Sequence, residues 1–180
     1  TRGFRDSLEI RRGIRDNAWD HRTPYAPVLV PRYLRCPVGG RINRDGEEIE
    51  PLEPGDVEAA IRRFQQEGVE SIAICLFNSF LNDAHERHAE QLLREKLPTI
   101  LLNRSSAVAP TMGEYERSST AVVSAYVAPR VAIYLSELSA RLATLGLKQP
   151  MLIVQNSGGL QSVQSVIEHP ASLLLSGPAA

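Results

Sequence analysis

The chain has 180 residues, 43% of them hydrophobic and 23% charged, proportions usual for one globular domain or two small ones. The net charge of −1 gives no electrostatic reason to expect nucleic acid or an acidic membrane as partner, and no apolar run approaches the ~20 residues that span a bilayer. Cys36 and Cys75 lack metal-ligand spacing, so we expect a cytoplasmic protein without a disulfide framework.

The first third of the chain is predicted to be irregular except for one hairpin. Residues 1–10 resemble a strand exit that enters a turn and a short helix. Three prolines exclude a regular helix in residues 11–32, and a loop of that length often has a function. Asp45-Gly46 lies between β-compatible flanks and predicts an antiparallel hairpin.

Residues 54–103 predict a helix–strand–helix–strand unit of the doubly wound kind. The first helix is expected to have Asp56 as its N-cap and Gly68 beyond its C-terminus. The continuous apolar run 71–77 is typical of a strand buried in a parallel sheet. The second helix begins at Asp83, which forms a capping-box-like pair with Glu86, and a strand follows at residues 99–102.

Two long helices are expected after a loop at residues 104–111. Their apolar stripes run from Met112 to Tyr126 and from Val131 to Leu145, and Pro129 stands between them. We expect both helices to pack on the sheet or to bridge two subdomains.

The last thirty residues predict a place for an anion. Apolar runs at 151–154 and 173–175 are interpreted as strands that end in turns of small residues, with a helix between them. Free N–H groups at a helix N-terminus and the helix dipole favour a phosphate or carboxylate. The residues predicted to lie near a phosphate are Asn156, Gly158, Gly159, Ser176 and Gly177.

Other candidates for chemistry are weaker. His85 and His88 lie on one helix face, but the HExxH spacing and a third ligand are missing, so no metal site is predicted. Ser157 and Ser176 lie outside any GxSxG motif and are more typical of caps or turns than of nucleophiles. The isolated carboxylates of Asp6, Glu114 and Glu116 leave the catalytic residues unassigned.

Six ordered strings resemble the hydantoinase A / 5-oxoprolinase family, and together they cover essentially the whole chain. The strings are TRGFRDSLEI, LVPRYLR with GRINRDGE, GVESIAICLFNSFLNDAHE, EYERSSTAVVSAYVAP, MLIVQNSGG and LLLSGPAA. The family includes ATP-dependent N-methylhydantoin amidohydrolases, 5-oxoprolinase and related subunits of acetone and acetophenone carboxylases.

The resemblance implies an α/β fold of the actin, sugar-kinase and heat-shock-ATPase group: ribonuclease-H-like, with a mixed sheet flanked by helices. Residues 1–110 would complete the N-terminal domain, and residues 111–180 would form a helical connection and the start of the second domain. Phosphate-binding hairpins of the DxGGTxTD and DMGGTSTD types are expected before Thr1 and after Ala180. The chain would then be an internal piece of a longer protein, marginally stable and almost without ATPase activity.

The family pattern SNGG stands here as Asn156-Ser157-Gly158-Gly159, which keeps the glycine turn but exchanges the first two side chains. The pattern SGPA is matched by residues 176–179. The resemblance therefore implies that backbone N–H groups at these turns, rather than serine hydroxyls, contact the nucleotide.

The resemblance also implies that ATP, with Mg²⁺, phosphorylates a carbonyl oxygen of the substrate. Water then opens a hydantoin or 5-oxoproline-type ring, or, in the alternative, a ketone is carboxylated by an acetone- or acetophenone-type complex. A hydantoinase B-type subunit is the implied partner. Two further alternatives stay open, a carbohydrate or acid kinase and a non-catalytic binding or assembly module.

Overall fold

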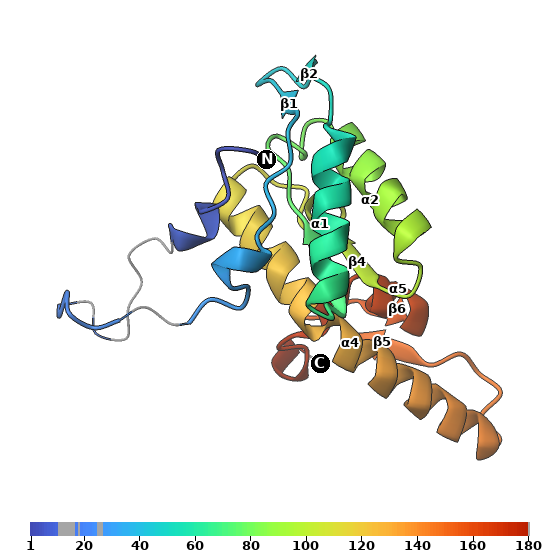
Figure 1. The fold of residues 1–180 in the computed structure, drawn as a ribbon. Coiled ribbons are helices and arrows are strands. Elements are labelled where there is room, and N and C mark those ends of the chain that lie inside the picture. Colours follow the sequence, from blue (N-terminus) through green and yellow to red (C-terminus); the bar gives the residue numbers. More distant parts are fainter. Residues whose placement is uncertain (11–16, 18, 25–26, 180) are drawn as a thin grey trace.

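The computed structural model describes residues 1–10, 17, 19–24 and 27–179 (Figure 1). It shows a mixed α/β chain in which the described strands form three separate two-stranded sheets. Part of the predicted 11–32 loop lies outside the described residues. Two short 3-10 helices, η1 (Ser7–Glu9) and η3 (Arg32–Leu34), flank that part, and Arg32 Nη2 lies 2.9 Å from Asp6 Oδ2.

The hairpin predicted around Asp45-Gly46 is confirmed. Strands β1 (Arg41–Ile42) and β2 (Glu48–Glu50) pair antiparallel, and Gly46 has the positive φ of 83° that the turn requires. Two amides from a neighbouring loop hold the hairpin in place. Asn78 Nδ2 donates to the carbonyls of Ile42 and Asn43, and Asn82 Nδ2 donates to the carbonyl of Gly46 at 2.8 Å.

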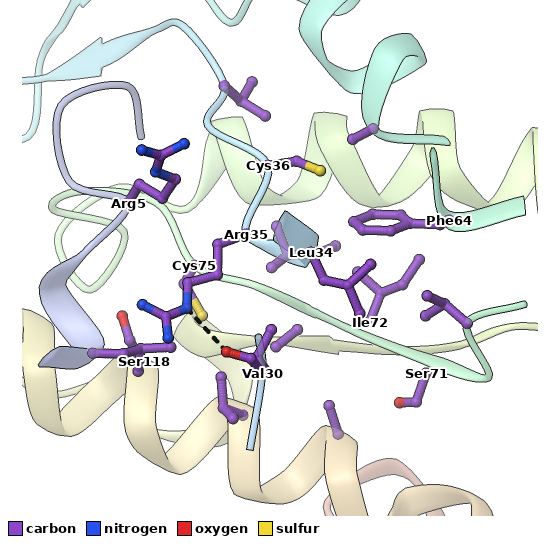
Figure 2. Close-up of a pocket in the computed structure, with 18 of the residues that line it drawn as sticks. Arg5, Val30, Leu34, Arg35, Cys36, Phe64, Ser71, Ile72, Cys75 and Ser118 are labelled. Carbon is purple, nitrogen blue, oxygen red and sulfur yellow. Dashed lines mark hydrogen bonds between the residues drawn. The ribbon is translucent and has the colours of Figure 1, made fainter. Parts of the chain in front are cut away.

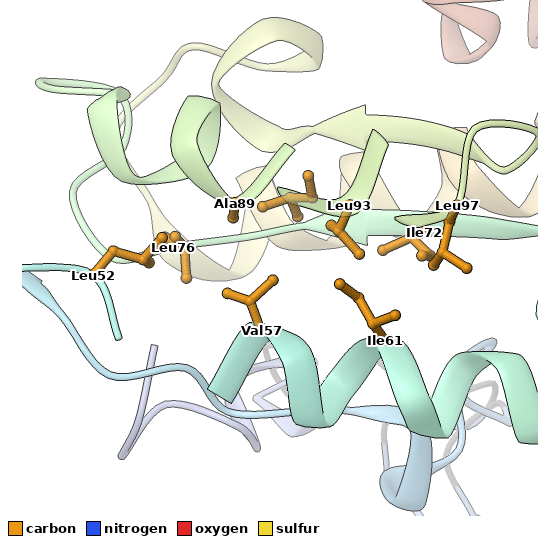
Figure 3. Close-up of a cluster of buried hydrophobic side chains, with 9 residues drawn as sticks. Leu52, Val57, Ile61, Ile72, Leu76, Ala89, Leu93 and Leu97 are labelled. Carbon is orange, nitrogen blue, oxygen red and sulfur yellow. The ribbon is translucent and has the colours of Figure 1, made fainter. Parts of the chain in front are cut away.

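The predicted helix–strand–helix–strand unit is also confirmed, although the ends of both strands differ from the predicted ones. Its elements are α1 (Pro54–Gln66), β3 (Ser71–Ile74), α2 (Ala84–Lys96) and β4 (Leu101–Arg104). β3 and β4 pair parallel. The main hydrophobic core lies between this sheet and the two helices (Figure 3). Its buried members are Leu52, Val57, Ile61, Ile72, Ile74, Leu76, Ala89, Leu93 and Leu97.

Of the two predicted N-caps, Asp56 is wrong, and Asp83 is confirmed in position but makes no side-chain capping bond. In α1, Glu53 is the N-cap and accepts a hydrogen bond from Gly55 N, because Pro54 already begins the helix. Asp56 lies in the first turn and accepts instead from Gly39 N at 2.8 Å. In α2, Asp83 occupies the N-cap position without a side-chain capping bond, while Asn82 Oδ1 accepts from Ala84 N.

The predicted break at Pro129 does not occur. After a one-turn helix α3 (Ser105–Val108), which replaces the middle of the expected loop, a single 31-residue helix α4 runs from Glu114 to Thr144. A proline inside a helix removes one N–H donor and crowds the carbonyl four residues before it, at a cost of about 3 kcal/mol. Packing stabilises α4 on both sides of that point, because its first half lies against β3 and β4 and its second half against the C-terminal elements.

By length and composition alone, α4 could cross a membrane. However, Arg117 and Ser124 on this helix are fully buried against the sheet, and Ser124 Oγ donates to Asn103 Oδ1 at 3.0 Å. A core helix of a globular protein passes the same test, so we interpret α4 as one.

The C-terminal region differs most from its prediction. β5 (Leu152–Val154) pairs antiparallel with β6 (Leu160–Ser162), and a short helix α5 (Val163–Glu168) and the 3-10 helices η4 (Pro170–Leu173) and η5 (Gly177–Ala179) follow. The second expected strand, 173–175, is wrong: Leu173 ends η4 and Leu175 is 82% exposed. Among the described residues no strand pairs with that run. The region packs on α4 through Val131, Leu135 and Val166.

Candidate functional site

The first predicted phosphate turn is the tip of a β-hairpin. Asn156, Gly158 and Gly159 connect β5 to β6, and Gly158 has a φ of 83°. Gly158 N donates to Gln155 O at 3.0 Å, and Gln155 N donates to Gly159 O at 2.8 Å. Because no helix begins at this turn, the expectation of a helix dipole there is wrong.

The second predicted turn is linked to the first through η4. Asn156 N donates to Ser172 O at 2.8 Å, and Ser176 follows four residues later with its own N–H bonded to Leu173 O. Gly177 begins η5, and a Cβ added there would meet nothing within 4 Å. The structure thus joins the two segments, while the role of these five residues as phosphate contacts stays a prediction.

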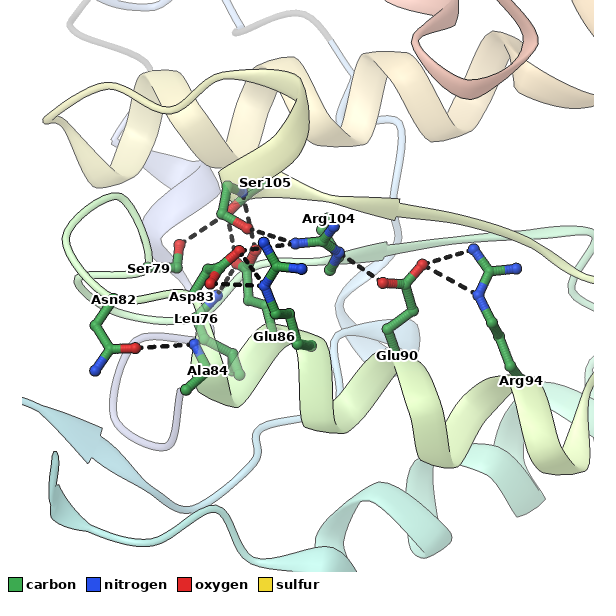
Figure 4. A network of polar contacts seen from close by, with 12 residues as sticks. Leu76, Ser79, Asn82, Asp83, Ala84, Glu86, Glu90, Arg94, Arg104 and Ser105 are labelled. Carbon is green, nitrogen blue, oxygen red and sulfur yellow. Dashed lines mark hydrogen bonds and ion pairs between the residues drawn. The ribbon is translucent and has the colours of Figure 1, made fainter. Parts of the chain in front are cut away.

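A buried ionic network, which sequence reasoning missed, lies at the carboxyl ends of β3 and β4 (Figure 4). Glu86 on α2 is 0% exposed. Its Oε1 accepts hydrogen bonds from Leu76 N at 2.9 Å and Ser105 Oγ at 2.6 Å, and its Oε2 accepts one from Ser106 N at 2.9 Å. Glu86 therefore holds together the loops after both strands and does not form the predicted capping box.

Arg117 on α4 is the cation of this network and is also 0% exposed. Its Nε donates to Ser105 Oγ at 3.2 Å, and its Nη2 pairs with Glu114 and donates to Leu76 O. The guanidinium carbon lies 5.3 Å from the centroid of the Phe80 ring. Buried charges are tolerated when they are paired and hydrogen-bonded, and these contacts meet that condition.

A row of ion pairs lies between this buried network and the solvent. Arg104 bridges Asp83 and Glu90, at 3.0 and 2.6 Å, and Arg87 binds both carboxylate oxygens of Asp83. The hydrogen bonds from Arg87 hold the pKa of Asp83 below its usual range. Arg94 completes the row by binding Glu90.

A polar recess of about 380 Å³ opens beside this network. Its walls combine the hairpin tip, the loop after β3 and the start of α3; the lining residues are Asp45, Gly46, Ser79, Phe80, Leu81, Asn82, Asp83 and Ser106. Ligands of open α/β sheets bind outside the carboxyl ends of the strands, which is where the recess lies. Its hydroxyls, amide and carboxylates can hydrogen-bond a small polar molecule.

A larger cavity, of about 790 Å³, lies along β3 (Figure 2). Cys36 and Cys75 line it as free thiols. Burial raises the pKa of both thiols, that of Cys75 to about 12. Because the thiolate is the reactive form, the raised pKa values argue against either cysteine as a nucleophile. Arg35 Nε donates to Val30 O, and both residues line this cavity.

The remaining sequence candidates are structural or exposed. His85 is buried with its Nε2 2.7 Å from Glu48 Oε2, whereas His88 is exposed. Within the described residues no group of three or more His, Cys, Asp or Glu side chains could hold a metal ion. Ser157 Oγ donates to the side chain of Gln155 in an exposed turn. Arg32 binds Asp6 and lowers its pKa.

Comparison with known proteins supports the resemblance seen in the sequence. Residues 1–97 match the hydantoinase/oxoprolinase N-terminal region, and residues 117–180 match the hydantoinase/oxoprolinase domain. The chain is 39% identical over 181 residues to caprolactamase subunit alpha of Pseudomonas jessenii, covering 99% of this chain and 26% of that protein. It is 30% identical over 157 residues to the acetophenone carboxylase gamma subunit of Aromatoleum aromaticum, covering 83% and 21%.

Solved structures agree with these matches. The crystal structure of the ATP-dependent caprolactamase from Pseudomonas jessenii aligns with a TM-score of 0.92 over 99% of this chain and 26% of that one. The nucleotide-free structure of acetone carboxylase, at 26% identity, aligns with a TM-score of 0.85 over 99% and 27%. The chain thus spans about a quarter of the length of these relatives. Since both family regions match and the fold is shared, the chain belongs to the hydantoinase/oxoprolinase family.

Proposed function

We propose that the chain is part of a longer protein, here called the full-length protein, which uses ATP to open a cyclic amide. The alignment with an ATP-dependent caprolactamase carries this proposal, because it extends over 99% of the chain at 39% identity. Caprolactam is a lactam, and hydantoins and 5-oxoproline are cyclic amides of the same chemical class. The two domain parts proposed for this chain are residues 1–110 and 111–180, within a ribonuclease-H-like fold of the actin and sugar-kinase group.

The proposed reaction has three steps. The amide oxygen attacks the γ-phosphorus of ATP, an O–P bond forms, and ADP leaves. Water then adds to the activated carbon and the C–N bond of the ring breaks, with a proton passing to the leaving nitrogen, which leaves an acyl phosphate. A second water hydrolyses the acyl phosphate to carboxylate and phosphate, so that one ATP and two waters are consumed for each ring opened. Phosphoryl transfer needs mainly positioning and electrostatic stabilisation, which backbone N–H groups can supply.

In this proposal the C-terminal turns form one wall of the nucleotide site. Gly177 supports that role, because its open surroundings allow a phosphate to approach the backbone closely. Asn156, Gly158, Gly159 and Ser176 are the other proposed contacts. Mg²⁺ would neutralise phosphate charge when bound with ATP. The residues that the structure describes do not form a three-ligand metal site, so we assign no Mg²⁺ ligand and derive no step from the ion.

A ketone carboxylase is the second candidate, because the acetone carboxylase structure aligns over 99% of the chain. Relatives carry the names of subunits, which supports a partner subunit, and we propose one of the hydantoinase B type. A cytoplasmic location is proposed with it.

Purified full-length protein, with its partner subunit, should be assayed for ADP release with caprolactam, hydantoin, 5-oxoproline, acetone and acetophenone. The proposal expects ADP and ring-opened product in equal amounts with a cyclic amide, without bicarbonate. ADP release with a ketone that requires bicarbonate would establish the carboxylase alternative instead. A stable phosphorylated product would indicate a kinase, and no ADP release with any compound would indicate a binding or assembly module.

A further inference from the structure

The 790 Å³ cavity is a slot along one edge of β3 (Figure 2). In the described part of the chain, β3 pairs only with β4, and its other edge carries no strand. The slot follows that edge from Ser71 to Phe77. One wall belongs to α1, through Val57, Ala60 and Phe64, and the opposite wall belongs to α4, through Ser118, Val122 and Ala125.

The backbone of β3 presents hydrogen-bonding groups to this slot. Leu101 N donates to Glu70 O, so the peptide groups of the even-numbered residues point toward β4. Because successive residues of a strand alternate, the N–H and C=O groups of Ala73 and Cys75 point into the slot. Phe77 continues this odd-numbered series, and its N–H donates to Thr1 Oγ1 at 2.8 Å. Backbone groups inside a protein require partners, and a parallel strand would supply them.

We propose that the residues directly before Thr1 in the full-length protein form a β-strand that fills this slot, parallel to β3. Thr1 lies beside Phe77, at the carboxyl end of the slot, so a strand that entered at the opposite end would arrive at Thr1 without a connecting loop. The relatives of the same fold contain about four times this length of chain, which is enough to supply the strand.

The positions of the helices support the parallel direction. The connection from β3 through α2 to β4 is a crossover between parallel strands, and such crossovers are almost always right-handed. A strand before Thr1 would connect to β3 through α1, just as β3 connects to β4 through α2. Two right-handed crossovers that advance in the same direction across a sheet place their helices on the same face, so α1 should cover the same face as α2. Figure 3 shows this arrangement, with Val57 and Ile61 of α1 and Leu93 of α2 in one core.

The slot is therefore a place for a strand and not for a ligand. Its apolar walls, and the thiol of Cys75 with its raised pKa, are the surroundings of a buried β-strand. The proposal depends on the existence of the full-length protein but not on its substrate. An amide, a ketone or no substrate at all would leave it unchanged.

Hydrogen exchange of the full-length protein, read at single amides by mass spectrometry, tests the proposal. The amides of Ala73 and Cys75 should exchange as slowly as those of Ile72 and Ile74, roughly a thousandfold more slowly than in an unstructured peptide. The residues just before Thr1 should be protected to the same degree. Ile72 and Ile74 are internal controls, because β4 protects that side of the strand in either case.

Three results would overturn the proposal. Fast exchange at Ala73 and Cys75, with Ile72 and Ile74 protected, would show an open edge. Protection that disappears on dilution would show a strand from a second copy. Protection that appears only when a partner subunit is added would show a strand from that partner.

Discussion

Glu86 and Arg117, both fully buried, are joined through the single hydroxyl of Ser105, which donates to the carboxylate at 2.6 Å and accepts from the guanidinium at 3.2 Å. The two charges come from helices on opposite sides of the β3–β4 sheet. Their shared contact with Leu76 fixes the loop that follows β3, because Glu86 accepts from its N–H and Arg117 donates to its carbonyl. That loop forms a wall of the polar recess.

Glu86→Gln should destabilise the full-length protein by about 3–5 kcal/mol, because it removes the carboxylate charge and places an N–H₂ group where three donors converge. The midpoint of urea unfolding, followed by circular dichroism, measures the effect. Glu95→Gln is the matched control on the exposed face of the same helix, and it should change stability by less than about 0.5 kcal/mol. Equal midpoints for the two variants would contradict the structural role of the buried carboxylate.

Arg117→Lys should also destabilise, by about 2–4 kcal/mol, although the charge is kept. A lysine ammonium cannot reproduce the planar set of contacts to Ser105, Leu76 and Glu114. The same replacement at Arg141, whose side chain is 79% exposed, serves as control and should be nearly neutral. A small effect at Arg117 would mean that only the positive charge, and not the planar geometry of the guanidinium, is needed at this position.

The sequence predicted the elements that depend on local signals. The turn at Asp45-Gly46 and the positive φ of 63° at Gly68 follow from backbone chemistry that glycine alone satisfies easily. The parallel pair β3–β4 followed from the apolar run at residues 71–77, which has no polar face to leave in water.

Features that depend on distant partners were missed. Pro129 looks like a helix end, but contacts of α4 with both halves of the molecule outweigh the loss of one N–H donor. The run 173–175 looks like a strand, yet Pro170 begins a 3-10 helix there and no partner strand is at hand in the described residues. In the sequence Glu86 looks like a capping residue. In the structure its carboxylate is instead bound by Ser105, nineteen positions away, which no local signal indicates.

Asp83 should make stability fall at acid pH. Hydrogen bonds from Arg87 lower its pKa in the folded protein, so its contribution is fully present above the unfolded pKa of about 3.9 and is lost as the pH falls through the folded pKa. In Asp83→Asn the difference between urea midpoints at about pH 5 and about pH 3 should therefore be smaller than in the wild type. Asp45→Asn, in the exposed hairpin turn, should leave that difference unchanged. An Asp83 variant with the wild-type acid response would show that the Arg87 contact contributes nothing.

Cys75 should resist alkylation in the native protein. A pKa of about 12 leaves roughly one thiol in ten thousand ionised at about pH 8, so iodoacetamide should react about a thousandfold more slowly than with a free cysteine. Mass spectrometry of digested protein measures the labelling, and the same reaction in urea is the control, where Cys75 should react at the ordinary rate. Rapid labelling of Cys75 in folded protein would contradict the raised pKa of its thiol.

Gly177→Ala separates nucleotide contact from folding. A Cβ at Gly177 meets nothing within 4 Å, and the residue has no positive φ, so the variant should unfold at the wild-type urea midpoint. If the backbone at this turn approaches a phosphate of ATP, the added methyl group should raise KM for ATP about tenfold, equivalent to about 1.4 kcal/mol. Gly55→Ala, in the first turn of α1, is the matched control and should leave KM for ATP unchanged. A wild-type KM for Gly177→Ala, measured by ADP release from the full-length protein, would remove Gly177 from the proposed nucleotide wall. That result would leave the proposed cyclic-amide substrate unchanged, because the assay of ADP release with different substrates does not depend on Gly177.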